Sequence, residues 1–136
     1  MKFTNSLIKG KLLKRYKRFF ADIKVNNKII TAHCPNTGSM QGLLDEGNEV
    51  LVTEHNDPKR KLKFTLEIIK AKKRYVGVNT HRANKIVNHG LENKLISEFK
   101  TIKNIKPEFK FSDDTRFDFL CDNNLIEVKN VTLFRE

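Results

Sequence analysis

Cysteine and long apolar runs are both scarce in this sequence. Cys34 and Cys121 stand far apart and no CxxC pair occurs, so the sequence predicts neither a disulfide framework nor a cysteine-rich zinc site. No apolar stretch approaches the roughly 20 residues of a membrane-spanning helix. The N-terminal segment is basic but lacks an uninterrupted apolar core and a small-residue cleavage site, which argues against a secretory signal. We therefore expect a cytoplasmic protein with no membrane segment.

Acidic residues are few relative to basic ones, and the imbalance lies in one half of the chain. The 27 Lys and Arg against 16 Asp and Glu give a net charge of +11. Residues 1–75 hold 17 basic and 7 acidic residues, a net charge of +10, whereas residues 76–136 hold 10 and 9, a net charge of +1. Basic side chains that neutralise phosphates release condensed counterions and so gain affinity. The first half of the chain is therefore expected to bind nucleic acid. The alternative is that its lysine-rich surface only keeps the protein soluble.

The first half has the pattern of short β-strands separated by turns. Asn26-Asn27 is a turn-prone pair between two extended stretches and predicts a hairpin, and residues 43–47 fit one helical turn. The expected strands are residues 12–25, 28–33, 49–53, 64–71 and 75–78. Five short strands with one helical turn fit a small closed barrel of the oligonucleotide-binding (OB) type.

From Thr80 the apolar period changes from two to near 3.6, which predicts one or two amphipathic helices around Gly90. Their apolar stripe is Ala83, Ile86, Val87, Leu91, Leu95, Ile96 and Phe99. Three strands are then expected over residues 105–111, 116–121 and 125–131. The predicted fold is α+β, with a barrel domain over 1–78 and a helix-plus-strands domain over 79–136, joined near residues 78–82.

Two carboxylates and a lysine lie on the last two predicted strands. Side chains alternate between the two faces of a strand. Asp118 therefore lies on the face opposite to its apolar neighbours Phe117 and Phe119. On the next strand, Glu127 and Lys129 share one face. A two-residue loop at Asn123-Asn124 would put Asp118 opposite Lys129, with Glu127 diagonal on the same face. A loop with an odd number of residues would scatter the three.

These three residues have a known use in phosphodiester hydrolysis. Asp118 and Glu127 supply oxygen ligands for Mg²⁺ or Mn²⁺, and Lys129 would position a water or stabilise the transition state. The alternative is a solvated strand face that carries an ordinary Glu/Lys pair. Two further carboxylates, Glu98 and Glu108, lie close in sequence and could add a ligand to this site. The simpler interpretation is that both are surface charges.

Basic and aromatic residues alternate near the start of the chain, as they do in barrels that bind single strands by stacking bases on rings. Because strand alternation cannot expose Tyr16, Phe19 and Phe20 together, one or two of these rings are expected in the core. The loop Asn36 to Ser39 fits either a phosphate-binding turn or a structural one. The candidate nucleic-acid ligands are Arg15, Tyr16, Lys17, Arg18, Lys59, Arg60 and Lys61.

Several motifs make the chain resemble the sugar fermentation stimulation protein family. They are LKRYKRFFAD at 13–22, HCPNTGSM at 33–40, VNT at 78–80 with Ala83-Asn84, RFDF at 116–119 and IEVKNVTL at 126–133. The resemblance implies an OB-like barrel followed by a PD-(D/E)xK nuclease-like core, whose motif residues are Asp118, Glu127 and Lys129. It also implies non-specific DNA binding and a role in regulating sugar metabolism. Family members continue beyond the ExK strand, so the resemblance implies a chain with a truncated nuclease-like core.

Three functions follow from these features. The first is a DNA-binding protein whose affinity is electrostatic, with little base readout. The second is an Mg²⁺-dependent nuclease that uses Asp118, Glu127 and Lys129. The third is a protein whose basic half binds structured RNA.

Overall fold

The computed structural model describes residues 2–135, and its contacts divide the chain into two units. Of the described residues, the barrel unit comprises Lys2–Thr80 and 131–135, and the helix–sheet unit comprises His81–Asn130. The division between Thr80 and His81 falls inside the predicted boundary region. In the structure, residues 131–135 belong to the barrel unit, whereas the second domain was predicted over 79–136.

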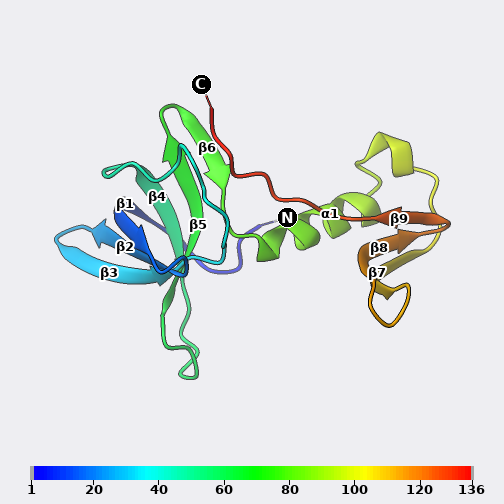
Figure 1. Cartoon of the computed structure of the whole chain (residues 1–136), viewed down its shortest axis with the longest axis horizontal. Coiled ribbons are helices and arrows are strands. Elements are labelled where there is room, and N and C mark those ends of the chain that lie inside the picture. Colours follow the sequence, from blue (N-terminus) through cyan, green and yellow to red (C-terminus); the bar gives the residue numbers. More distant parts are fainter. Residues whose placement is uncertain (1, 136) are drawn as a thin grey trace. The chain divides into compact units, whose positions relative to one another are not determined.

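Five strands of the barrel unit form a closed barrel, and a sixth extends it (Figure 1). The strand order is β3-β2-β1-β4-β5-β6, and a parallel pairing of β3 with β5 closes the sheet through Ala32↔Phe64 and His33↔Thr65. Closure removes the free strand edges that an open sheet exposes. The predicted OB-like barrel is therefore confirmed. The strands are β1 Leu7–Tyr16, β2 Phe20–Val25, β3 Lys28–His33, β4 Glu49–Glu54, β5 Phe64–Ala71 and β6 Arg74–Gly77.

The first predicted strand, 12–25, was wrong, because a tight turn at Lys17–Phe19 splits it into β1 and β2. Lys17 and Arg18 both adopt left-handed backbone conformations, with φ of 50° and 62°, which reverses the chain and pairs Tyr16 with Phe20. The predicted hairpin at Asn26-Asn27 is confirmed, with Val25 opposite Lys28. The helical turn predicted over 43–47 is replaced by non-helical turns.

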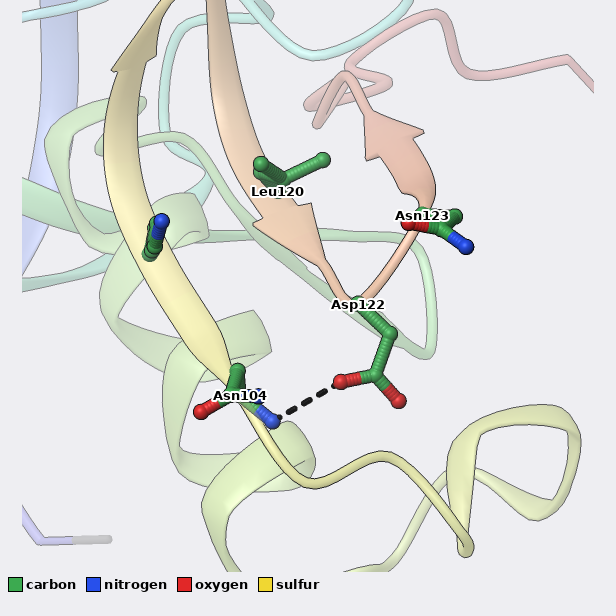
Figure 2. Close-up of a pocket in the computed structure, with 5 residues that line it drawn as sticks. Asn104, Leu120, Asp122 and Asn123 are labelled. Carbon is green, nitrogen blue, oxygen red and sulfur yellow. Dashed lines mark hydrogen bonds between the residues drawn. The ribbon is translucent and has the colours of Figure 1, made fainter.

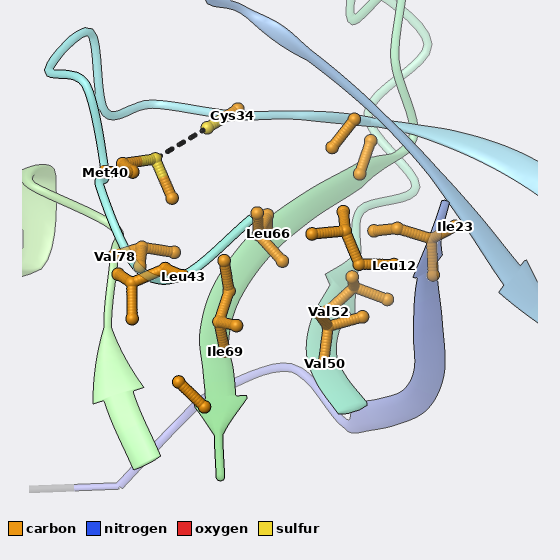
Figure 3. Close-up of a cluster of buried hydrophobic side chains, with 13 residues drawn as sticks. Leu12, Ile23, Cys34, Met40, Leu43, Val50, Val52, Leu66, Ile69 and Val78 are labelled. Carbon is orange, nitrogen blue, oxygen red and sulfur yellow. Dashed lines mark hydrogen bonds between the residues drawn. The ribbon is translucent and has the colours of Figure 1, made fainter. Parts of the chain in front are cut away.

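The barrel core draws side chains from all five closing strands and from the loop that follows β3 (Figure 3). Cys34 and Met40 of that loop are buried with their sulfur atoms 3.7 Å apart, and Leu43 packs beside them. Full burial of one such aliphatic side chain stabilises a fold by about 1.5–3 kcal/mol. The buried core residues are Leu12, Ala21, Ile23, Ala32, Cys34, Met40, Leu43, Val50, Val52, Leu66, Ile69, Ala71 and Val78.

The loop Cys34–Gly42, which we call the motif loop, receives the segment Val131–Phe134. The Asn36 side chain donates a hydrogen bond to the Thr132 hydroxyl (3.1 Å), and the Phe134 amide donates to the Gln41 carbonyl (3.0 Å). Gly42 has a φ of +86°, and a Cβ there would overlap the Phe134 carbonyl. A side chain at position 42 would therefore both strain the backbone and displace this segment.

The helix–sheet unit packs one helix against a small antiparallel sheet of order β7-β8-β9. Its elements are α1 His81–Glu92, the 3₁₀ turn η1 Ser97–Phe99, β7 Ile105–Lys110, β8 Arg116–Cys121 and β9 Asn124–Ile126. The core consists of Leu91, Ile102, Phe119 and Cys121, with partly buried neighbours such as Val87 and Ile126. The last strand, predicted over 125–131, ends at Ile126.

Among the residues that the structure describes, no helix combines the length and apolar composition of a membrane-spanning segment.

Candidate functional site

Asp118 lies on β8, the central strand of the helix–sheet unit, and is half-buried. Its Oδ1 accepts a hydrogen bond from the Asn84 side chain of α1 (2.8 Å), and its Oδ2 accepts one from the Val128 amide (2.6 Å). The carboxylate thus links the helix, the central strand and the segment after β9. Sequence reasoning did not find these two partners, although Asn84 belongs to a motif that carries the family resemblance.

The register between β8 and β9 differs from the predicted one by two residues. The turn is Asp122-Asn123 and not Asn123-Asn124, so that Cys121 pairs with Asn124 and Phe119 with Ile126. If the ladder continued one step beyond Ile126, this register would bring Glu127, and not Lys129, opposite Asp118. The loop still has an even number of residues, which is the condition that a shared face for the two carboxylates requires.

The turn is fixed by contacts distant in sequence. The Asp122 carboxylate accepts hydrogen bonds from the amides of Lys103 (3.2 Å) and Asn104 (3.0 Å), and the Asp122 amide donates to the Asn104 carbonyl (3.0 Å). Figure 2 shows Asp122 directed toward Asn104 at one side of a pocket of about 420 Å³. The pocket is lined by Asn104, Lys106, Leu120, Asp122 and Asn123, and none of the three motif residues lines it.

Glu127 and Lys129 form an ion pair whose side chains are 56% and 74% exposed. The hydrogen bond to Glu127 raises the pKa of Lys129, the charge of Glu127 adds to this, and the charge of Asp118 contributes a smaller part. Lys129 thus pairs with a carboxylate of the same motif. Within residues 2–135, no three His, Cys, Asp or Glu side chains are grouped as metal ligands.

Neither of the two additional carboxylates completes such a group. Glu108 lies between the pairs Pro107↔Phe119 and Phe109↔Phe117, which places it opposite Asp118 in the β7–β8 register. Its φ of 52° interrupts the alternation of the strand there. Glu98 lies on η1, where its carboxylate accepts a hydrogen bond from Ser97 (3.1 Å).

In the barrel unit, the turn between β1 and β2 presents Lys17, Arg18 and Phe19 to solvent, and the Phe19 ring is 48% exposed. Tyr16 stacks on Phe20 with ring centroids 5.5 Å apart, and both are half-buried. The expectation that one or two of the three rings enter the core was therefore wrong. The turn interrupts the strand alternation on which that expectation depended.

Arg15 was predicted to contact nucleic acid, but its guanidinium is engaged within the protein. It donates to the carbonyls of Arg18 (3.1 Å), Asn36 (2.7 Å) and Ser39 (3.5 Å), and so ties the β1–β2 turn to the motif loop. The Asn36 side chain accepts a hydrogen bond from the Gly38 amide (2.9 Å), which makes this part of the loop a structural turn. Arg15 therefore has a structural role in this fold.

The loop between β4 and β5 carries the other predicted basic ligands, Lys59, Arg60 and Lys61. The Arg60 guanidinium donates to the Thr65 hydroxyl (2.7 Å), and the Lys59 amide donates to Asp57 (2.9 Å). A second pocket, of about 380 Å³, brings this loop together with the β1–β2 turn. It is lined by Phe19, Phe20, His33, Arg60, Lys61 and Leu62.

Comparison with known proteins covers both units. The model of the SfsA N-terminal OB domain matches residues 13–78, and the model of the sugar fermentation stimulation protein RE domain matches residues 81–136. Two curated relatives are the sugar fermentation stimulation protein homologs of Pelagibacter ubique and Alteromonas mediterranea. The first is 65% identical over 100% of this chain and 60% of its own length, and the second is 44% identical over 98% and 61%. The chain thus spans about 60% of the length of these relatives.

The fold also has a solved counterpart, the structure of Pyrococcus furiosus SfsA in complex with Ca²⁺. It aligns with a TM-score of 0.72 and 22% sequence identity over 90% of this chain and 53% of the other. At that identity the likeness concerns the fold. Together with the two domain models and the curated relatives, it shows that this chain belongs to the sugar fermentation stimulation protein family.

Proposed function

We propose that the barrel unit binds DNA without sequence specificity, through electrostatic contacts with the phosphate backbone. The observation that carries this proposal is the meeting of two basic segments, the β1–β2 turn and the β4–β5 loop, at one pocket of the barrel. Lys17 and Arg18 are exposed beside Phe19, and Arg60 and Lys61 line the pocket itself. The regulatory role in sugar metabolism that the family resemblance implies would act through this binding.

The charge distribution supports the same assignment. Residues 1–75 hold 17 basic and 7 acidic residues, a net charge of +10. The buried carboxylate of Glu67 accepts hydrogen bonds from Thr53 (2.7 Å) and Asn79 (2.9 Å), and Asp22 accepts them from Tyr16 (3.1 Å) and Thr31 (2.9 Å). These two acidic side chains are engaged within the barrel unit. The exposed surface is correspondingly basic, which suits a polyanionic partner.

The test measures the affinity for a labelled DNA duplex at several salt concentrations. Affinity should fall steeply between about 50 and 200 mM salt, because each phosphate contact releases counterions. Changing Lys17 and Arg18 together to Gln should weaken binding and make the salt dependence shallower by about 1 per lost contact. A complex that is insensitive to salt would contradict the proposal.

A matched control lies on the turn between β5 and β6. Lys72 and Lys73 are also adjacent, basic and exposed, and Lys72 also has a left-handed backbone, with φ of 57°. Changing them to Gln removes the same charge from another turn of the barrel. An equal loss of affinity in both variants would show that total charge, and not the surface at Lys17 and Arg18, determines binding.

A second candidate function is Mg²⁺-dependent phosphodiester cleavage. The observation that favours it is the position of Lys129. This residue forms an ion pair with Glu127, and the charge of Asp118 contributes to its raised pKa. The two carboxylates fit a hard cation, because Mg²⁺ is often held by one or two carboxylates and several waters. Each Asp118 oxygen accepts one hydrogen bond, so each retains an acceptor site. Asp118 and Glu127 would hold Mg²⁺ or Mn²⁺, which would activate a water and offset charge on the phosphate.

Cleavage and binding can be separated by substitution. If the site is catalytic, Lys129→Ala should abolish Mg²⁺-dependent cleavage of labelled DNA and leave DNA retention nearly unchanged, because retention depends on the barrel. Glu98→Gln removes a carboxylate of the same unit outside the motif and serves as the control. Cleavage that persists in Lys129→Ala, or that is absent from the unaltered protein with Mg²⁺ or Mn²⁺, would contradict this second function.

A further inference from the structure

We propose that the second pocket of the barrel unit holds one unpaired base and its phosphate, so that the protein prefers single-stranded to duplex nucleic acid. This inference rests on the proposed binding function of the barrel and specifies its ligand. The pocket walls combine three apolar side chains, Phe19, Phe20 and Leu62, with two cationic ones, Arg60 and Lys61. Unpaired nucleotides present this combination of a flat apolar face and a nearby negative charge.

The apolar wall is suited to stacking. The Phe19 ring is 48% exposed at the tip of a turn, although burial of a phenyl ring is normally favourable. Phe20, the next residue, also lines the pocket and stacks on Tyr16. Bases of any identity stack on such rings, so this contact would add affinity without sequence readout.

The polar wall is held in place by the fold. Arg60 is half-buried, and its hydrogen bond to the Thr65 hydroxyl (2.7 Å) anchors the guanidinium beside the pocket. Lys61, the next residue, is exposed at the same pocket. The pocket volume of about 380 Å³ lies within the roughly 300–1,000 Å³ of sites that enclose small ligands.

Phe19 is also positioned before any ligand binds. The Cys34 amide donates to the Phe19 carbonyl (2.7 Å), the Phe19 amide donates to the Lys17 carbonyl (2.7 Å), and Arg15 holds the Arg18 carbonyl (3.1 Å). Because the backbone of the turn is held in this way, it loses little conformational entropy when a base stacks on the ring that it carries. The left-handed backbone of Lys17 and Arg18 is thus part of what places the ring at the pocket.

These features favour a single strand over a duplex. In a duplex the base faces are covered by neighbouring bases, so a ring on the protein surface contacts only edges and backbone. In a single strand the faces are accessible and can stack on aromatic side chains. A duplex would therefore make the phosphate contacts of the basic surface but would not fill the pocket.

The experiment compares four labelled ligands of equal length at one salt concentration: an oligothymidylate, an oligouridylate, an abasic strand and a duplex. Phe19→Leu removes the ring and keeps an apolar residue. It should weaken binding of the oligothymidylate about tenfold, the loss expected for one base–aromatic stack. Binding of the abasic strand and of the duplex should not change. Tyr75→Leu is the control, because Tyr75 is 58% exposed on β6 and its ring faces the Lys70 ammonium at 5.2 Å.

The outcomes separate the two proposals. Equal affinity for oligothymidylate and duplex, or an unchanged oligothymidylate affinity in Phe19→Leu, would overturn the pocket assignment and leave phosphate binding by the barrel intact. An equal loss for the abasic strand would also overturn it, because that loss reflects the turn and not stacking. If no ligand binds in a salt-dependent way, the proposed function itself fails. If the oligouridylate binds more tightly than the oligothymidylate and loses the same affinity in Phe19→Leu, the result would support the pocket as a base-binding site. It would also show that single-stranded RNA is preferred to single-stranded DNA.

Discussion

The barrel unit and the helix–sheet unit differ most in how their cores are built. In the barrel, five strands enclose a core that the motif loop completes with Cys34 and Met40, followed by Leu43. In the helix–sheet unit, one helix and a three-stranded open sheet bury Leu91, Ile102, Phe119 and Cys121. Small domains bury a smaller fraction of their surface and are correspondingly less stable. The two units should therefore differ in their free energy of unfolding, and the barrel should be the more stable of the two.

The largest expected effect comes from removing one core leucine in each unit. Leu66→Ala should lower the free energy of unfolding of the barrel by about 2–5 kcal/mol, because it leaves a cavity in a closed core. Leu91→Ala should destabilise only the helix–sheet unit. The sequence has no Trp, and its two Tyr, Tyr16 and Tyr75, both lie in the barrel unit, so Tyr fluorescence during urea unfolding reports on the barrel. A barrel transition that shifts equally in both variants would show that the two units unfold together.

The next effect concerns the segment Val131–Phe134 on the motif loop. Gly42→Ala should destabilise the barrel by about 1–3 kcal/mol, because Ala is strained at φ +86° and its Cβ would displace Phe134. Gly47→Ala is the matched control, since Gly47 has a φ of +91° and a Cβ added there would meet no atom within 4 Å. Urea unfolding gives the difference between the two. The same loss in both would mean that the docked segment adds nothing to the barrel.

A smaller effect is expected at the Asp118 hydrogen bonds. Asp118→Ala should destabilise the helix–sheet unit by about 1–3 kcal/mol, because it leaves Asn84 and the Val128 amide without this acceptor. Hydrogen exchange of the Val128 amide should accelerate, and the Tyr signal of the barrel should not move. Asp113→Ala, which removes a carboxylate that is 99% exposed, should leave the exchange unchanged. Unaltered exchange at Val128 in Asp118→Ala would contradict the proposed link.

The smallest expected effect is a difference in alkylation rate between the two cysteine thiols, one in each core. Burial raises the pKa of the Cys121 thiol above its ordinary value of 9.0, and the charge of Asp122 adds to this. Because the folded state favours the protonated thiol, this contribution to stability is complete below about pH 9 and is lost as the pH rises through the folded pKa. Because the helix–sheet unit is expected to be the less stable of the two and to open more often, alkylation of Cys121, followed by mass spectrometry, should be faster than that of Cys34 at neutral pH, although the raised pKa of Cys121 by itself lowers its thiolate fraction. Faster labelling of Cys34 would reverse the proposed order of stability.

Much of the fold could be predicted from the sequence where local patterns determine it. The change of apolar period at Thr80 coincides with the division between the two units, and the alternation of apolar and polar residues around Asp118 predicts β8. Asn26-Asn27 forms the predicted hairpin because asparagine tolerates the left-handed backbone that such turns require. The family motifs supply the OB-like barrel, which the domain models match independently.

The remaining features depend on contacts between residues distant in sequence. The turn at Lys17-Arg18 contains neither Gly nor Asn, and Arg15 supports it from outside. The β8–β9 register follows from Asp122 and the amides of Lys103 and Asn104. No periodicity distinguishes the extended segment Val131–Phe134 from a continuation of the last strand. Its position depends on Asn36 and Gln41 in the motif loop, almost a hundred residues earlier.

The motif loop holds both ends of the polypeptide that forms the helix–sheet unit. The Thr80 hydroxyl donates to the Pro35 carbonyl (3.0 Å), and the Thr132 hydroxyl accepts from the Asn36 side chain (3.1 Å). In topological terms the helix–sheet unit is an insertion into the barrel unit. Residues on either side of this insertion, Thr80 and Thr132, bind to consecutive residues of the motif loop. The entropy of closing such an insertion grows only with the logarithm of its length. A change in the length of this insertion should therefore cost the barrel little free energy of folding, provided that the contacts of Thr80 and Thr132 are kept.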